Sequence, residues 1–389
     1  MVPGTIPGTV PGTKLCEVYM KIKKSNIKNI IIISSFILII YGTVLLNIFL
    51  PDKEISYSER RRLLRFPSFS IESLLSGEFF EDYEKYSLDQ FPFRDGFRSL
   101  KAYTKLNILK QKDNKLIYIV NGNINKMEYP LNEKAIINAA NKFNEVYQKY
   151  LQGMNVSYAI IPDKNYFLAN DNGYLSFDYD RLLELMDENV QNMNYINLFS
   201  TLELDDYYMT DIHWRQESII DVAKLLIEKM GNRSEDFDNK YTEKSLYPFY
   251  GSYYGQAALK LTPDTLIYLT NDIIENASVY DHIDKTHSKV YIEDKFGTID
   301  SYDLFISGAK SLLTITNPMS STDKKLLIFR DSYCSSIAPL MLDEYAQITM
   351  VDLRYMSTDL LSTYIDFTMD QDVLFLYNTT ILNNSYMLK

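Results

Sequence analysis

The sequence predicts an α/β domain, in which parallel strands alternate with crossover helices, carried behind a membrane-spanning helix. Three observations predict this organisation. The late apolar runs KKLLIF, QITMVDL and DVLFLYN are typical of strands buried on both faces, and helical stretches separate them. An earlier group of β-prone runs alternates with helical stretches in the same way. An uncharged apolar run near the N-terminus is long enough to cross a bilayer.

Composition excludes several classes of protein. With 389 residues, 46% of them hydrophobic, the chain can bury a large core. The net charge of -11 argues against a nucleic acid partner, because phosphate binding needs clustered Lys and Arg. Cys16 and Cys334 lie on opposite sides of the apolar run, which predicts neither a disulfide framework nor a cysteine zinc site. No set of metal ligands is visible in the sequence, and no G-x-G-x-x-G or Walker sequence for a nucleotide is present, so we expect no metal and no cofactor.

The N-terminus begins with a repeat. Residues 2–13, VPGTIPGTVPGT, are too rich in Pro and Gly to bury a core, so we expect residues 1–29 to be a disordered, cytoplasmic N-terminus. Met20 opens MKIKKSNIKN directly ahead of the apolar run, which is how a membrane-targeted protein commonly begins. Our hypothesis is that the true start is Met20.

The apolar run itself covers residues 30–50. Its 21 uncharged residues would span about 32 Å as a helix, enough to cross a bilayer. A cleaved signal peptide is the alternative, but the run is longer than an h-region and no A-x-A-like site follows it. The positive-inside rule then predicts a single-pass plasma-membrane protein with a cytoplasmic N-terminus and an extracytoplasmic domain, since four lysines precede the run: Lys21, Lys23, Lys24 and Lys28.

The exported part divides into a linker and a domain. Residues 51–114 show helical spacing of apolar positions and predict a helical linker. Residues 115–389 carry the α/β pattern. We expect strands at KLIYIV, VSYAIIP and YINL and helices near residues 132–151 and 179–193, followed by the three late strands. Residues 231–318 are irregular and β-prone, so we expect an insertion, a candidate cap over the site.

The stretch TDIHW contains the elements of a catalytic base. Asp211 and His213 lie two residues apart, so both side chains can point to one side of an extended or turn segment. A carboxylate that orients an imidazole is the base half of a serine-nucleophile triad. A helix is expected to follow at about residues 216–230. Trp214 is interpreted as either a packing residue or a platform for a sugar.

The stretch KKLLIFRDSYCSS supplies the nucleophile. A buried strand ends at Phe329 and a polar turn leads to a helix near Ser335, so Ser332 is expected where a strand end meets a helix N-terminus. The backbone N–H of Tyr333 would then be one oxyanion donor. Cys334 is a rival nucleophile, but it is interpreted as a small packing residue.

The motifs SERRRLLRFP, DQFPFR, TDIHW, FRDSY and VDLRY, in this order behind one apolar run, resemble the DHHW proteins, which belong with the SGNH-hydrolase-like AlgX/AlgJ group linked to polysaccharide O-acetylation. The resemblance extends from about residue 58 to residue 377. It implies a flavodoxin-like parallel sheet with helices on both faces and a Ser-His-Asp triad of Ser332, His213 and Asp211. Two positions depart from the pattern: Ile212 replaces the first His of Asp-His-His-Trp, and Arg330 replaces the usual Gly before Asp-Ser.

Three further positions match the family less specifically. Arg354 in VDLRY follows a strand, where its guanidinium would either hold a uronate or phosphate or form a structural ion pair. Lys164 in IIPDKNYF also follows a strand end and is a candidate substrate-binding residue. Gly251 in FYGSYY is a second candidate oxyanion donor through its backbone N–H.

Together these features predict an O-acetyltransferase that acts on a cell-surface or secreted polysaccharide in the cell envelope. The acyl donor is expected to be a membrane-bound O-acyltransferase, because an exported domain has no evident route to cytoplasmic acetyl-CoA. Two alternatives remain: an acetylesterase that uses the same triad, and a catalytically idle glycan-binding or assembly factor.

Overall fold

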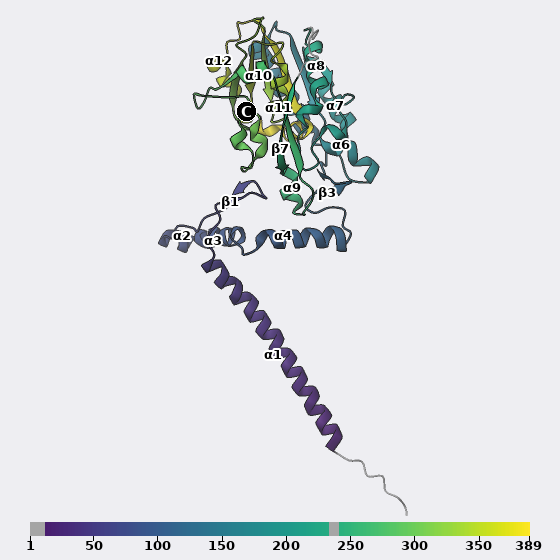
Figure 1. Cartoon of the computed structure of the whole chain (residues 1–389), viewed down its shortest axis with the longest axis vertical. Coiled ribbons are helices and arrows are strands. Elements are labelled where there is room, and N and C mark those ends of the chain that lie inside the picture. The colour runs from purple at the N-terminus through teal and green to yellow at the C-terminus, as the bar shows by residue number, and fades with distance from the viewer. Residues whose placement is uncertain (1–11, 233–240) are drawn as a thin grey trace, which may run out of the picture. The chain divides into compact units, whose positions relative to one another are not determined.

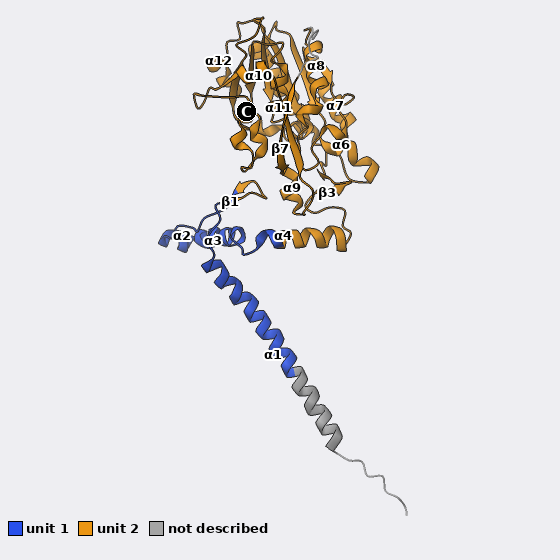
Figure 2. Cartoon of the chain, in the orientation of Figure 1, with its two compact units in different colours: residues 1–55, 62–96 blue, residues 56–61, 97–389 orange. Residues whose placement is uncertain are grey.

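The computed structural model of the protein describes residues 12–232 and 241–389 (Figure 1). The chain forms two compact units (Figure 2), one of residues 1–55 and 62–96 and the other of residues 56–61 and 97–389. The units therefore divide within the segment expected to be a linker and not at residue 114, because residues 56–61 and 97–114 of that segment belong to the large unit.

The first unit begins with α1, Gly12–Phe49. Its part from Asn26 to Phe49 is long and apolar enough to cross a membrane, by length and composition. The helix corrects the expectation of disorder up to residue 29: it begins at Gly12, because no Gly or Pro interrupts the chain between Thr13 and Tyr41. The repeat before Gly12 lies outside the described residues.

Three short helices follow α1 in the chain. Ser70 caps α2 by accepting the Ser73 N–H, and Gly77, at φ 87°, separates α2 from α3. The bounds are α2 Ile71–Ser76, α3 Glu78–Asp89 and α4 Arg94–Tyr103, with a π-helical turn at Thr104–Ile108. Two short strands also lie here, β1 Ile55–Ser56 and β2 Arg61–Arg62.

The large unit is built on an eight-stranded sheet in the order β10-β9-β11-β13-β12-β14-β5-β6. The strands from β13 to β6 are parallel, whereas β9, β10 and β11 extend the sheet antiparallel. The bounds are β5 Val156–Ile161, β6 Asn194–Asn197, β9 Ser278–Asp281, β10 Thr286–Ser288, β11 Leu312–Thr316, β12 Lys325–Arg330, β13 Gln347–Val351 and β14 Asp372–Asn378.

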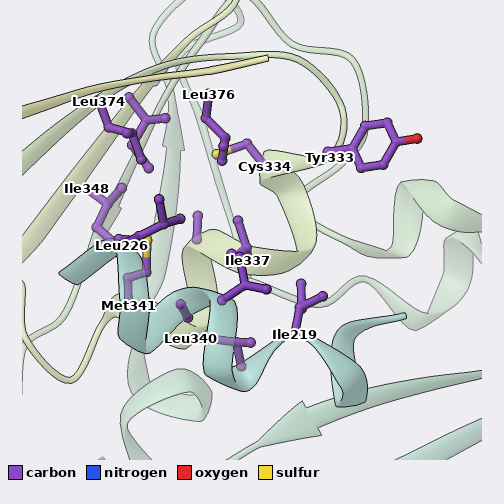
Figure 3. Packing of buried hydrophobic residues seen from close by; sticks show 14 of the residues in the cluster. Ile219, Leu226, Tyr333, Cys334, Ile337, Leu340, Met341, Ile348, Leu374 and Leu376 are labelled. Carbon is purple, nitrogen blue, oxygen red and sulfur yellow. The ribbon is translucent and has the colours of Figure 1, made fainter. Parts of the chain in front are cut away.

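Helices cover both faces of this sheet, as the sequence predicted. Alternate residues of each central strand enter one of two cores, which is the period-two pattern of a sheet buried on both sides. Figure 3 shows the first core, where α8 and α11 pack on the sheet and Cys334 lies beside Leu376. The second core lies under α5 and α7. The helices are α5 Glu133–Val146, α6 Lys164–Leu168, α7 Tyr179–Asn189, α8 Ile220–Lys229, α11 Cys334–Ile337, α12 Leu361–Tyr364 and α13 Thr379–Leu382.

One strand assignment and the role expected for the insertion need correction. KLIYIV forms β3, Ile117–Val120, which pairs only with β4, Asn123–Lys126, and so stays outside the main sheet. The expected insertion does more than cover the domain, because β9, β10 and β11 complete the sheet edge. It also contains β7, Thr242–Phe249, β8, Asp264–Thr270, and two short helices, α9, Ser252–Ala257, and α10, Asp272–Asn276.

Candidate active site

The nucleophile turn, residues 330–334, follows directly from strand β12. Asp331 accepts the N–H of Tyr333 at 3.0 Å and the N–H of Asn378, at the end of β14, at 2.7 Å. One buried carboxylate thus fixes the turn and ties two neighbouring strand ends together. Ser332 lies between Asp331 and α11 and stays partly exposed, at the carboxyl edge of the parallel sheet where α/β proteins place their sites.

The base loop, residues 207–214, is irregular. Tyr207 and Trp214 pair in an isolated antiparallel bridge, and the Tyr208 N–H donates to the His213 carbonyl. Inside this closed loop, the Asp211 carboxylate accepts the N–H of His213 at 3.0 Å, the local turn that Asp favours. The two side chains are therefore held on one side of the loop.

The structure brings the three expected triad residues together. His213 Nε2 lies 2.8 Å from Ser332 Oγ, and His213 Nδ1 lies 2.5 Å from Asp211 Oδ1. Asp211 is fully buried and His213 is only 6% exposed. With its Nδ1–H directed at the carboxylate, the imidazole presents the Nε2 lone pair to the serine hydroxyl, which is the arrangement a general base requires.

Several groups hold the Asp211 carboxylate. Its second oxygen, Oδ2, accepts the N–H of Ser252 at 2.5 Å and lies 3.7 Å from the guanidinium of Arg60. Burial alone would raise the pKa of Asp211, but the neighbouring His213 and Arg60 outweigh burial and hold this pKa below its usual range. The carboxylate stays ionised and can stabilise an imidazolium.

Arg60 and Tyr302 are two residues of the site that sequence reasoning missed. Arg60 also donates to Asp300 at 3.1 Å, so it bridges two carboxylates. Tyr302 stacks on the His213 ring, with centroids 3.8 Å apart and planes at 4°, and its hydroxyl donates to Ser336. Arg60 lies in the SERRRLLRFP motif, so the motif was a signal for it; a tyrosine 89 positions after His213 gives no such signal.

Lys164 does not face a substrate. It is buried, and its ammonium donates to the backbone carbonyls of Ile124, Tyr208 and Met209 at 2.7–3.1 Å and to that of Asp211 at 3.3 Å. Burial lowers the pKa of Lys164 to about 7, against the opposing effect of Asp264 and Asp211. The expectation of a substrate-binding lysine is therefore corrected: Lys164 holds the base loop in place by hydrogen bonds to its backbone carbonyls.

Trp214 and Arg354 are also structural. Trp214 is fully buried and donates from Nε1 to the Tyr333 carbonyl at 3.1 Å and to Ser336 Oγ at 2.8 Å, so it packs the base loop against the nucleophile turn and cannot serve as a sugar platform. Arg354 makes a two-point contact with Asp352, at 2.9 and 2.6 Å. Of the two interpretations of Arg354, the structure shows the ion pair.

The two expected oxyanion donors are already engaged. The N–H of Tyr333 donates to Asp331, and the N–H of Gly251 donates to Thr210 Oγ1 at 3.0 Å. Neither N–H is free for a substrate oxygen, which goes against both assignments. Gly251 has a different role: a Cβ there would lie 2.3 Å from the Thr210 carbonyl oxygen, so only glycine permits this approach to the base loop.

The departures from the family pattern leave the triad intact. Arg330 is fully buried and donates to Ser335 Oγ at 3.1 Å. The Ile212 side chain packs against the core, while its carbonyl accepts the Tyr333 hydroxyl at 2.6 Å. Burial raises the pKa of Cys334 to about 12, which keeps this thiol protonated and unsuited to act as the nucleophile.

Metal ligands are not assembled in the part of the chain that the structure describes. No group of three or more His, Cys, Asp or Glu side chains there is arranged to hold an ion. The chemistry considered below uses the chain's own side chains.

Comparison with solved structures identifies the fold. One match is to a DHHW family protein from Eubacterium siraeum. It has a TM-score of 0.59 and 20% identity, and it covers 71% of this chain and 94% of that one. The chain has the fold of a DHHW family protein. Two structures of Bacillus cereus PatB1, one with a sulfonyl adduct, match with TM-scores of 0.55 and 0.54 at 17% identity, each covering 69% of this chain and 97% of PatB1.

These matches support the α/β fold class that the sequence predicted, in which helices cover both faces of a sheet with parallel central strands. A match to the O-acetyltransferase domain of Pseudomonas putida AlgJ has a TM-score of 0.36 and 11% identity, too low to support an argument. No family model matches the sequence, and no curated protein matches it.

Proposed function

We propose that the large unit is an acyltransferase that uses Ser332 as its nucleophile and transfers an acetyl group to a hydroxyl of a cell-surface or secreted polysaccharide. The observation that carries the proposal is the continuous contact from Ser332 Oγ through the His213 ring to Asp211. Three residues from two remote segments meet in the order that nucleophilic catalysis needs, and a purely structural histidine has no need of a partly exposed serine.

In the first half-reaction, His213 Nε2 takes the proton of Ser332 Oγ as the oxygen attacks the carbonyl carbon of an acetyl ester donor. Asp211, kept ionised, stabilises the imidazolium that forms. The tetrahedral intermediate collapses, the donor's C–O bond breaks, and the departing alkoxide takes the proton from His213. Ser332 then carries the acetyl group as an ester.

In the second half-reaction, His213 takes the proton of an acceptor hydroxyl, whose oxygen attacks the acetyl-serine. Collapse of the second intermediate breaks the bond to Ser332 Oγ, which recovers its proton from His213. A sugar hydroxyl as acceptor gives transfer, and water gives hydrolysis. The N–H of Ser332 is our oxyanion donor, because it has no hydrogen-bond acceptor among the described residues, unlike that of Tyr333.

The proposal also includes the setting of the reaction. The lysines ahead of the apolar run, in the N-terminal part of α1, favour a cytoplasmic N-terminus, so the large unit would lie outside the membrane, away from acetyl-CoA. A membrane-bound O-acyltransferase that delivers acetyl groups across the bilayer would supply the donor.

The test is hydrolysis of an activated acetyl ester by the full chain in detergent. We expect Ser332→Ala and His213→Ala to lose activity by about 10⁴-fold, with folding checked by circular dichroism. Addition of candidate polysaccharides then distinguishes a transferase from an esterase, since acetate appears on the sugar in one case and in water in the other. An inactive but folded wild type, or activity that survives both substitutions, would refute the catalytic role and favour a glycan-binding function.

A further inference from the structure

The first unit exposes an unusual amount of apolar surface outside α1. Between residues 64 and 93, ten large hydrophobic side chains are at least 40% exposed, with Leu75 at 83%. A soluble surface of this length rarely carries so many, and such patches mark contact with a membrane or a protein. The exposed side chains are Leu64, Phe66, Phe69, Ile71, Leu75, Phe80, Tyr83, Leu88, Phe91 and Phe93.

Part of this surface also packs within the unit, because Phe66 and Tyr83 contact other aromatic rings while they stay partly exposed. On α3, Phe79, Tyr83 and Tyr86 turn toward Phe66, with ring centroids 5.3–6.3 Å from it. At 100° per residue, Phe80 and Leu88 lie within 80° of each other on a face of α3 that also carries Glu81 and Glu84, whereas Asp82 lies on the other side of the helix. The aromatic contacts thus use one face of α3 and leave Phe80 and Leu88 exposed on another.

Hydrogen bonds place this surface at one end of α1. The Gln90 carbonyl, at the end of α3, accepts from Asn47 Nδ2 at 3.1 Å, and Asn47 lies two residues before the end of α1. The Gln90 side chain bonds both the N–H and the carbonyl of Lys53, at 3.0 Å each. The Tyr86 hydroxyl donates to Asp52 at 2.8 Å. The C-terminal end of α3 is therefore held beside the residues at which α1 would leave the bilayer.

We propose that residues 64–93 lie in the outer interface of the lipid bilayer, with the apolar side chains of α2 and α3 inserted among the headgroups and upper acyl chains. The inference rests on the proposed membrane anchor. If α1 spans the bilayer, Asn47 lies near the bilayer surface, and its hydrogen bond to Gln90 holds the end of α3 there. Apolar faces of such helices enter the headgroup and acyl boundary by about 5–10 Å.

Lipid is the occupant that this position favours. A surface fixed beside the exit of a spanning helix meets headgroups before it meets any second protein, and Phe and Tyr are well suited to this layer. The charge of the segment defines the interaction further: six Asp or Glu residues stand against Arg65 and Lys85 between residues 64 and 93. Binding is therefore driven by apolar burial and not by attraction to anionic lipids.

The experiment uses nitroxide labels on the full chain in vesicles of phosphatidylethanolamine and phosphatidylglycerol, with Cys16→Ser so that the only native thiol left is the buried Cys334. Single cysteines replace Leu75 and Leu88 on the apolar surface, Asp82 on the other side of α3 as the matched control, and Leu38 within α1 as the reference for the membrane interior. Power saturation compares accessibility to oxygen, which enters lipid, with accessibility to a water-soluble nickel chelate.

We expect the labels at positions 75 and 88 to be several-fold more accessible to oxygen than to nickel, at a depth on the order of 5–10 Å, and the label at 82 to favour nickel. Added salt would leave these depths unchanged. Nickel-accessible labels at 75 and 88 beside a lipid-exposed label at 38 would overturn the inference while leaving the anchor intact. Low access to both reagents would overturn it in favour of a protein contact, and a water-exposed label at 38 would reject the anchor itself.

Discussion

The two segments that meet at the candidate site are held in different ways. The nucleophile turn, residues 330–334, continues from β12 and is fixed by one carboxylate, Asp331, within the regular sheet edge. The base loop, residues 207–214, has no regular structure and depends on groups from remote parts of the chain, among them Lys164, Ser252 and Tyr302. Regular structure positions the nucleophile, whereas tertiary contacts position the base.

This difference predicts that substitutions around the base loop disturb catalysis without disturbing the nucleophile turn. The largest effect is expected for Gly251→Ala, because its Cβ would lie 2.3 Å from the Thr210 carbonyl oxygen and 2.4 Å from the Asp211 nitrogen. The base loop must shift, and a displacement near 1 Å costs about 100-fold in kcat/KM. Ester hydrolysis measures this loss.

Gly96→Ala is the matched control, because a Cβ at Gly96 meets no atom within 4 Å. It should retain wild-type activity. Equal activity of Gly251→Ala and Gly96→Ala would mean that the base loop tolerates displacement, and the contrast between the two segments would fail.

Lys164→Met removes the buried clamp and leaves its carbonyl partners unsatisfied, which should lower the free energy of unfolding by about 3 kcal/mol or more near neutral pH. The wild type also has a pH signature. Lys164 has a pKa of about 7 when folded against a reference value of 10.5, so the unfolded chain binds more protons between these values and stability rises with pH from 7 toward 10.

Thermal melting of the wild type and the variant at pH 7 and pH 9 checks both statements. The rise in melting temperature with pH should be smaller in Lys164→Met than in the wild type. An equal rise in both proteins would show that Lys164 does not change its protonation in this range.

Tyr302→Leu removes the ring stacked on His213 and should reduce kcat/KM by about 10-fold, since a ring face stabilises a cation by about 0.5–2 kcal/mol. Tyr302→Phe keeps the stack and loses only the bond to Ser336, so it should stay within about threefold of the wild type. If Tyr302→Phe loses as much kcat/KM as Tyr302→Leu, the hydroxyl matters and the stack does not.

Arg60→Gln should have the smallest effect, a loss of about fivefold in kcat/KM, because the guanidinium lies 3.7 Å from Asp211 and remains partly exposed. Loss of this cation favours protonation of the Asp211–His213 pair, so the acidic limb of the kcat/KM profile should move to higher pH. Arg60→Lys should restore the wild-type profile. A loss of activity with an unmoved limb would indicate a structural role alone.

The sequence predicted the elements that follow local rules. Uniformly apolar runs predicted the central strands, and the strand-to-helix turn predicted the position of Ser332 at a strand end. The Asp-x-His spacing predicted the contact between Asp211 and His213, because a short turn holds both side chains together. KLIYIV was misassigned to the main sheet, since a short β-prone run does not reveal its pairing partner.

The clamps around the base loop had no comparable signal. Lys164 bonds backbone carbonyls, which every residue possesses, so no side-chain pattern marks its partners. The burial of Trp214 and the close approach at Gly251 arise from packing between distant segments. The sequence did not show where these groups point, so Lys164 and Trp214 were predicted to bind substrate and Gly251 to donate to an oxyanion, whereas all three hold the base loop in place.

The pairing of His213 with Ser332 is tested most directly by covalent labelling. PatB1 has been obtained with a sulfonyl adduct, and a sulfonyl fluoride reacts with an activated serine hydroxyl by displacement of fluoride. Incubation of the full chain, followed by intact mass and peptide mapping, should place one sulfonyl group on Ser332, and His213→Ala should slow labelling by about 10³-fold or more. Labelling at another residue, or an unchanged rate in His213→Ala, would contradict a serine activated by this histidine.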